Sequence, residues 1–183
     1  MAVRETEKYE LDILAIQEVR REGQDSIRQG KYTFYYGGTQ SHNFGTGFRM
    51  KNSILSAVQN IEFVNERLSY VTIRTRWCNT VLINVHAPTD EADDNDKDTF
   101  YDELERLFDR FPKYNTKIVL GDFNAKVGRE EKYRPTIGKS SLHGINNNGE
   151  RLITFAISEN LLVKSTYFEH KDIHMDISGW PNS

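Results

Sequence analysis

Three short, largely apolar runs constrain the fold of this 183-residue chain more than any other feature. They occupy residues 13–16, 81–85 and 118–120. Each run is shorter than an ordinary helix, and a continuous apolar run of this size is typical of a β-strand that is buried on both faces. Such strands need a layer of other elements on each side. The sequence therefore predicts a layered domain with these strands at its centre.

Helical spacing appears twice among the remaining segments. The first helix is predicted from Phe100, Leu104, Leu107, Phe108 and Phe111, which Pro112 follows, and the second from Leu152, Phe155 and Ala156. Further strands are predicted near residues 32–38, 45–50, 69–77 and 161–168. Strand hairpins thus alternate with helices. This order predicts a mixed α/β (α+β) fold rather than a purely parallel sheet.

The composition indicates one globular domain over residues 1–183. Hydrophobic residues make up 37% and charged residues 28% of the chain, which argues against disorder. No glycine-, serine- or proline-rich linker divides the chain, and no apolar run is long enough for a membrane span. The start is too charged for a secretory signal, and the single Cys78 cannot form an internal disulfide. We therefore expect an intracellular protein without a membrane partner.

Charge leaves the class of partner open. The formal net charge is −3, but acidic residues concentrate between positions 87 and 112, so the rest of the chain is mildly basic. The acidic stretch coincides with the first predicted helix, where a solvated face explains it better than a binding tail does. A mildly basic remainder is compatible with a polyanion but does not require one.

Polar side chains follow each of the three buried runs. Glu18 follows the first, His86 the second, and Asp122 and Asn124 the third. Ligands gather at strand ends in layered α/β domains, so these side chains predict one site. Two carboxylates, Glu18 and Asp122, suit Mg²⁺, which keeps several waters and rarely takes an all-protein cage. Asn124 could donate to a phosphate oxygen, and His86 could stabilise developing charge or move a proton.

Each of these residues also has an ordinary structural explanation. A glutamate after a strand is often merely exposed, and Asp122 in the segment "GDFN" could bond its own backbone in a turn. A single histidine such as His86 is more often a structural residue than a catalytic one. The functional interpretation therefore depends on whether the fold brings the strand ends together.

The segments "LDILAIQEVR", "GTGF", "LINVHAPTD", "IVLGDFNAKVG" and "NNNGERLITFA" together resemble the endonuclease/exonuclease/phosphatase superfamily. Within it, they are similar to the apurinic-endonuclease-like domain of RTE-type non-LTR retrotransposons and to the related craniofacial development protein 2-like proteins. The resemblance covers roughly residues 9–174. It implies a four-layered sandwich of two mixed β-sheets flanked by helices, and Mg²⁺-dependent cleavage of DNA, with Mn²⁺ as the alternative metal.

The resemblance also implies roles for the four residues. Glu18 would be the metal ligand, Asp122 would orient or activate the attacking water, and Asn124 would bind the phosphate. His86 stands where many relatives carry tyrosine, so its role is the least defined. By resemblance alone, DNA is the expected partner, the nucleus is favoured over the cytoplasm, and a monomer is expected.

Two departures from the family pattern bear on activity. Family members begin with a strand that carries an asparagine near the metal, and they end with a strand that bears an aspartate-histidine pair central to catalysis. This sequence begins after the first of these strands and contains no Asp-His dipeptide. We therefore expect a sandwich that lacks the first and last family strands, with weakened or absent activity. The alternative is a non-catalytic remnant, or a domain repurposed for binding or a structural role.

Overall fold

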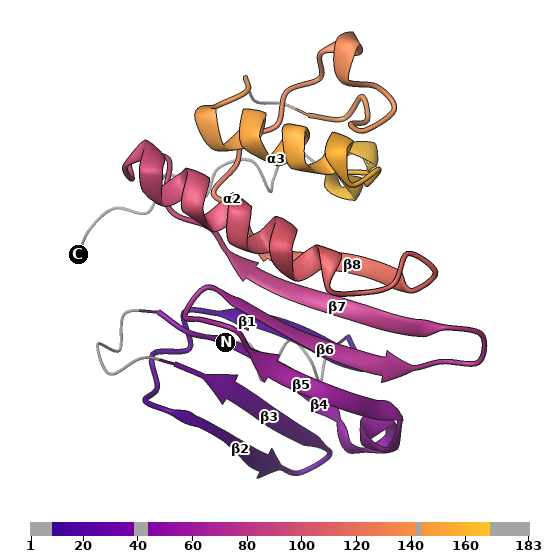
Figure 1. The fold of residues 1–183 in the computed structure, drawn as a ribbon. Helices are drawn as coiled ribbons and strands as arrows, with labels where there is room; N and C mark the ends of the chain where they lie inside the picture. The colour runs from indigo at the N-terminus through magenta and orange to yellow at the C-terminus, as the bar shows by residue number, and fades with distance from the viewer. Residues whose placement is uncertain (1–8, 39–43, 142–143, 169–183) are drawn as a thin grey trace. The chain divides into compact units, whose positions relative to one another are not determined.

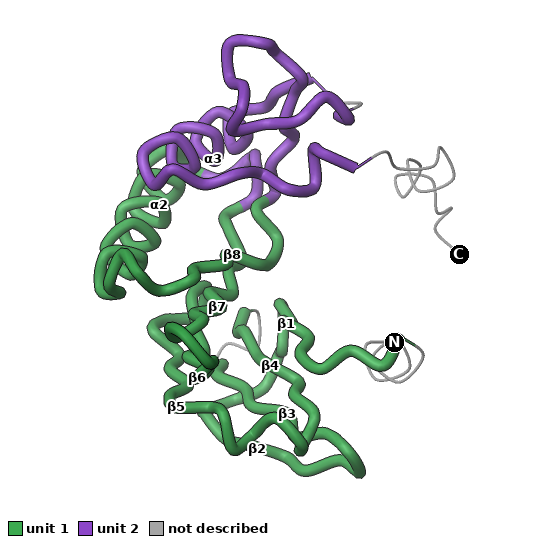
Figure 2. Tube along the Cα trace, turned by 90° about the vertical axis from the view of Figure 1, so that its right-hand side faces the viewer, with its two compact units in different colours: residues 1–88, 93–123 green, residues 89–92, 124–183 purple. Residues whose placement is uncertain are grey.

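The computed structural model describes residues 9–38, 44–141 and 144–168, which form two compact units (Figure 2). Residues 1–88 and 93–123 make up the first unit, and residues 89–92 and 124–183 the second. The single domain expected over residues 1–183 stays a prediction.

Two four-stranded sheets stack in the first unit (Figure 1). The order of sheet 1 is β1-β4-β3-β2, with every pair antiparallel. In sheet 2 the order is β5-β6-β7-β8, and only β7 and β8 are parallel. The strands of sheet 1 are β1 (Ile13–Gln17), β2 (Gln24–Gln29), β3 (Tyr32–Gly37) and β4 (Thr46–Lys51). Those of sheet 2 are β5 (Val58–Phe63), β6 (Leu68–Arg74), β7 (Asn79–His86) and β8 (Thr116–Asp122). The predicted α/β sandwich is confirmed.

The core between the sheets follows from side-chain alternation. Phe48 and Met50, two residues apart on β4, face Val71 on β6 and Leu82 on β7, and all four are buried. Because strand side chains alternate between faces, the same parity carries polar residues into this layer near the ends of the strands. Thr46 donates to Ser69 across the sheets at 2.7 Å between oxygens, and Asn84 lies two residues after Leu82. A 3₁₀ helix, η1 (Asn52–Ala57), connects β4 to β5.

Helix α2 (Asp94–Asp109) covers the outer face of sheet 2 (Figure 1). It begins at Asp93, whose side chain accepts a hydrogen bond from the backbone of Asn95, an ordinary N-cap. Its apolar side is buried against the sheet through Phe100, Leu104, Leu107 and Phe108. The acidic residues of this stretch lie mostly on the opposite, exposed side. These acidic residues form a solvated helix face, as the sequence predicts.

The second unit contains helix α3 (Asn147–Ser158) and two short 3₁₀ helices, η2 (Glu131–Tyr133) and η3 (Lys164–Tyr167). The prediction of a strand over residues 161–168 is wrong. Val163 forms only an isolated parallel bridge with Ile137, and the chain then turns into η3. Within the described residues, no helix combines the length and the apolar character that a membrane span requires.

Candidate functional site at the strand ends

The ends of β7 and β8 lie side by side. These strands run parallel with His86 opposite Asp122, and the backbone amide of Ala87 donates to the carbonyl of Asp122 at 2.8 Å. Parallel strands present their carboxyl ends at the same edge of a sheet. Residues far apart in sequence are therefore neighbours here. Figure 1 shows both strands beneath helix α2.

Gly121 allows this close approach. Its φ is +131°, and a Cβ atom at this position would lie 2.0 Å from the carbonyl oxygen of Val85 on β7. No side chain can occupy that space while the strands stay paired, so the glycine of "GDFN" is needed for the position of Asp122.

Glu18 reaches the same edge from sheet 1. Gln17, the last residue of β1, points toward sheet 2, so regular alternation would turn Glu18 to the opposite face. Instead, the backbone of Glu18 adopts a left-handed φ of +52°. This conformation brings its Oε1 to 4.0 Å from Nε2 of His86, while Oε2 accepts from Arg20 at 3.0 Å. The structure thus brings Glu18, His86 and Asp122 together.

His86 is the most enclosed member of this group, at 8% exposure. Burial and the nearby Arg67 guanidinium lower the pKa of His86 below its ordinary value of 6.5, and the carboxylates of Asp122 and Glu18 only partly oppose this. Its Nδ1 is buried and has no hydrogen-bond partner in the part of the chain that the structure describes. We assign the proton of the neutral ring to Nε2, the nitrogen that faces Glu18.

We expect His86 to titrate below its ordinary pKa in an NMR titration of the metal-free protein. Arg67→Ala should raise this pKa, because a cation beside the ring is lost, and Glu18→Gln should lower it further. As the pH falls, His86 takes up a proton in the unfolded chain before it does so in the folded protein. The stability that neutral His86 contributes is therefore present above its pKa in the unfolded chain and is lost as the pH falls toward its pKa in the folded protein. A pKa at or above the ordinary value would contradict the described environment.

Asn124 belongs to the second unit, two residues after Asp122 in the chain. Its backbone is left-handed, with φ of +48°, and its carbonyl accepts from the side chains of Asn146 and Asn148 at 3.3 and 3.2 Å. Asn146 is also the N-cap of α3, where it accepts from the amide of Gly149. The segment "NNNGE" therefore fixes the loop that carries Asn124.

An open groove of about 440 Å³ runs beside the strand ends in the first unit. Its lining residues are Ile13, Leu14, Ala15, Gln17, Leu120, Gly121 and Asp122. The groove has an apolar floor formed by β1 and β8, and Asp122 supplies a carboxylate within its lining. A ligand could reach Asp122 from this side.

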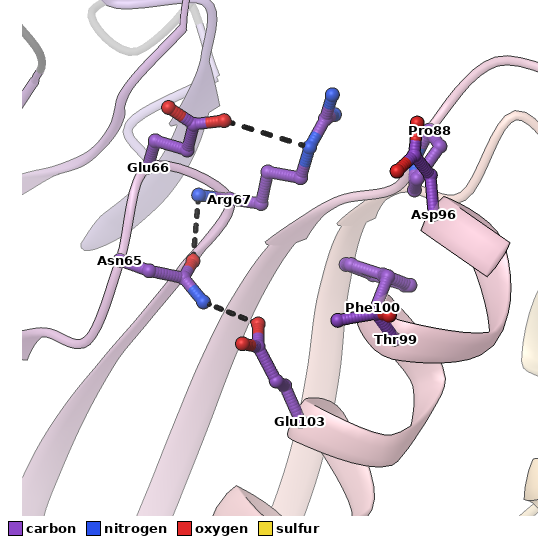
Figure 3. A pocket seen from close by; sticks show the side chains of 8 residues that line it. All are labelled: Asn65, Glu66, Arg67, Pro88, Asp96, Thr99, Phe100 and Glu103. Carbon is purple, nitrogen blue, oxygen red and sulfur yellow. Dashed lines mark hydrogen bonds and ion pairs between the residues drawn. The ribbon is translucent and has the colours of Figure 1, made fainter. Parts of the chain in front are cut away.

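A second hollow, of about 470 Å³, lies between the turn before β6 and helix α2 (Figure 3). Its lining residues are Asn65, Glu66, Arg67, Pro88, Asp96, Thr99, Phe100 and Glu103. In Figure 3, Asn65 links Glu103 of α2 to the backbone of Arg67. Three carboxylates against one guanidinium make this lining unfavourable for a phosphate group. Arg67 nevertheless supports the strand ends, since it donates to the carbonyl of His86 at 3.2 Å.

The residues at the strand ends fit a magnesium ion by their donor chemistry. Glu18 and Asp122 offer hard carboxylate oxygens, and both lie close enough to His86 to affect its pKa. No group of three or more His, Cys, Asp or Glu side chains suited to a metal occurs among the described residues. That pattern is compatible with Mg²⁺, which commonly takes one or two carboxylates and completes its shell with water and phosphate.

The sequence did not predict the residues whose side chains hydrogen-bond to the backbone of the segments that carry the candidate site residues. Asn84, Arg67, Asn146 and Asn148 were not among the predicted site residues. Asn84 carried a readable signal, because an amide inside the apolar run "VLINV" must find hydrogen-bond partners once it is buried. Arg67 carried none, since its partner is a backbone carbonyl 19 residues away.

Comparison with curated proteins finds two relatives that share one name. Craniofacial development protein 2 from Bos taurus is 31% identical over 166 residues, or 90% of this chain and 28% of the relative. The protein of the same name from Tragulus javanicus is 30% identical over 90% of this chain and 29% of its own length. This chain therefore spans less than a third of the length of these curated relatives.

Solved structures share the fold. The AP endonuclease LMAP from Leishmania major has a TM-score of 0.61 at 13% identity, covering 86% of this chain and 60% of that one. The endonuclease domain of TRAS1, a telomere-specific non-LTR retrotransposon, has a TM-score of 0.54 at 13% identity, covering 85% and 63%. A family model described as the endonuclease/exonuclease/phosphatase family matches residues 3–180. The sandwich, its strand ends and this match over nearly the whole sequence show that the chain belongs to the endonuclease/exonuclease/phosphatase family.

Proposed function

We propose that the chain is a Mg²⁺-dependent phosphodiesterase of the retrotransposon DNA endonuclease type, with weakened or absent activity in the present sequence. The observation that carries this proposal is the convergence of Glu18, His86 and Asp122 from two sheets. Family membership and the fold shared with an AP endonuclease and the TRAS1 endonuclease domain support it. The missing Asp-His pair is the reason to expect weakened turnover.

Each side chain has a definite task in this proposal. Asp122 orients a water and accepts its proton as the water oxygen attacks phosphorus and the bond from phosphorus to the leaving sugar oxygen breaks. Neutral His86 donates from Nε2 to an oxygen of the phosphate, where negative charge grows. Asn124, which belongs to the second unit, is proposed from the family resemblance alone to bind the phosphate. The leaving sugar oxygen takes its proton from solvent water.

Glu18 is the residue that would hold the metal. When bound, Mg²⁺ supplies Lewis-acid stabilisation of charge on the phosphate, and Mn²⁺ is the expected substitute. The carboxylates of Glu18 and Asp122 otherwise repel a phosphate, so their neutralisation is also a condition for substrate binding. The DNA backbone is the proposed partner, and a nuclear, monomeric protein is the accompanying proposal.

The test is a plasmid-nicking assay with purified protein. We expect slow conversion of supercoiled plasmid to the open circle in Mg²⁺, weaker or comparable conversion in Mn²⁺, and none in EDTA. Glu18→Gln should remove the metal-dependent nicking, which separates it from a contaminating nuclease. Nicking that persists in EDTA, or that Glu18→Gln leaves unchanged, would reject the assignment.

A non-catalytic binding domain is the second candidate. It is favoured by the sequence, which contains no Asp-His dipeptide, the pair that the family resemblance makes central to catalysis. This candidate predicts that the protein retards DNA in a binding assay without any nicking in Mg²⁺ or Mn²⁺. Metal-dependent turnover by the same preparation would exclude it.

A further inference from the structure

Asn84 links the two sheets directly beneath the strand ends. Its side chain is fully buried, at 0% exposure. Its Oδ1 accepts from Nε2 of Gln17 at 2.6 Å, and its Nδ2 donates to the carbonyls of Ile16 and Gly47, each at 3.0 Å. One side chain of β7 therefore holds two successive residues of β1 and one residue of β4. A buried amide with these partners is costly to disturb, because every lost partner leaves a desolvated polar group.

The residues that Asn84 holds are the two that precede Glu18. On the other side of Glu18, the amide of Val19 donates to the carbonyl of Gly45 at 3.2 Å. Glu18 is thus bracketed between two anchored segments while its own φ is +52°. A left-handed backbone at a residue with a side chain is unfavourable by about 1 kcal/mol or more, so it persists only where the surroundings impose it.

The carboxylate of Glu18 also lies near β7, the strand that carries Asn84. His86, two residues after Asn84 on β7 and on the same face, lies 4.0 Å from the Glu18 carboxylate. β7 therefore sets both where the backbone of Glu18 is held and what its carboxylate faces. The buried hydrogen bond from Thr46 to Ser69 also joins the sheets, but its two hydroxyl groups belong to β4 and β6.

From this geometry we infer that Asn84 is a positioning residue, which through Gln17 and the carbonyl of Ile16 holds Glu18 in the left-handed conformation that aims its carboxylate at the metal site. The inference rests on the proposed function for the role of Glu18, but the positioning itself is a property of the metal-free protein. It predicts that loss of Asn84 loosens the Glu18 backbone and weakens Mg²⁺ binding, beyond any general loss of stability.

Asn84→Ala and Ser69→Ala form a matched pair for the test. Each removes one fully buried polar side chain from the layer between the sheets, so both should lower the Tm. NMR backbone shifts and residual dipolar couplings report the conformation of Glu18, and titration calorimetry with Mg²⁺ gives the Kd, both well below either Tm. We expect Asn84→Ala to move Glu18 out of the left-handed region and to raise the Kd about tenfold, as supporting residues around metal ligands typically do. Ser69→Ala should change neither reading.

Gln17→Met is the second variant if Asn84→Ala does not fold. It removes only the amide that Asn84 accepts from, and it should give a smaller change in the same direction. An unchanged Glu18 conformation in the folded Asn84 or Gln17 variant, or an equal change in Ser69→Ala, would overturn the inference. Wild-type protein that binds no Mg²⁺ would instead count against the proposed function, and the Glu18 conformation would still decide the positioning role.

Discussion

Replacement of Asp122 by asparagine is expected to remove the Mg²⁺-dependent nicking of supercoiled DNA, a loss of about a hundredfold or more. The reason is chemical rather than structural. The asparagine amide has nearly the same shape as the carboxylate, but it cannot accept a proton from water and it binds a divalent cation poorly. The carbonyl of Asp122, which accepts from Ala87, is unaffected by the change, so the pairing of β7 and β8 should survive.

The measurement compares initial nicking rates at equal protein concentration, with circular dichroism and Tm to confirm folding. Asp102→Asn on the exposed side of α2 is the matched control, because it removes the same charge and only a weak ion pair, 4.0 Å from Arg106. This control should nick as fast as wild type. An Asp122→Asn protein that nicks as fast as the control would remove Asp122 from the catalytic set and with it the proposed site.

The part of the site that sequence could predict is the part encoded at strand ends. Glu18, His86 and Asp122 each follow a short apolar run, and because such runs become neighbouring buried strands, their ends meet. Helix α2 could also be predicted from the sequence, since Phe100, Leu104 and Leu107 repeat at helical spacing and Pro112 follows. Periodicity of this kind is local, and local patterns survive folding when burial reinforces them.

The rest depends on contacts between distant residues. Strand β2 is mostly exposed and polar, so no apolar alternation marks it, and it exists because its backbone pairs with β3. Tyr70 is buried, and its ring meets that of Phe111, which follows α2, at 4.9 Å between centroids, a contact that no local pattern predicts. The strand expected near Val163 lacks a neighbouring strand to pair with along its length in the described residues, so only one bridge forms.

Backbone conformation is the other property that the sequence left open. The pattern "GDFN" predicted a strand end but not that Gly121 would need a φ of +131°. Nor did "QEV" indicate the left-handed Glu18, since glutamate rarely adopts that conformation. Glu18 takes its uncommon conformation where regular alternation would aim the side chain elsewhere, and Gly121 takes its own where β8 passes close to Val85 of β7.

Gly121→Ala is expected to be the most destabilising small substitution at the site, by about 3 kcal/mol or more. Two costs coincide there: an unfavourable φ for any residue with a side chain, and a Cβ that would lie 2.0 Å from a backbone oxygen, which no rotamer change can relieve. The strands would have to separate between Val85 and Gly121. His86 and Asp122, the next pair in register, would then move apart.

A series of glycines separates these costs. Gly30 also has a positive φ, +58°, but an added Cβ would meet nothing within 4 Å, so Gly30→Ala should cost only about 1 kcal/mol. Gly144 has neither feature, and Gly144→Ala should stay within about 0.5 kcal/mol of wild type. Urea unfolding of the three variants gives the order directly. If Gly121→Ala proved no worse than Gly30→Ala, β8 would not approach β7 as closely as described, and the alignment of His86 with Asp122 would lose its structural basis. The expected order, with Gly121 far beyond the other two, ties the stability of the sandwich to the same backbone contact that sets the candidate site.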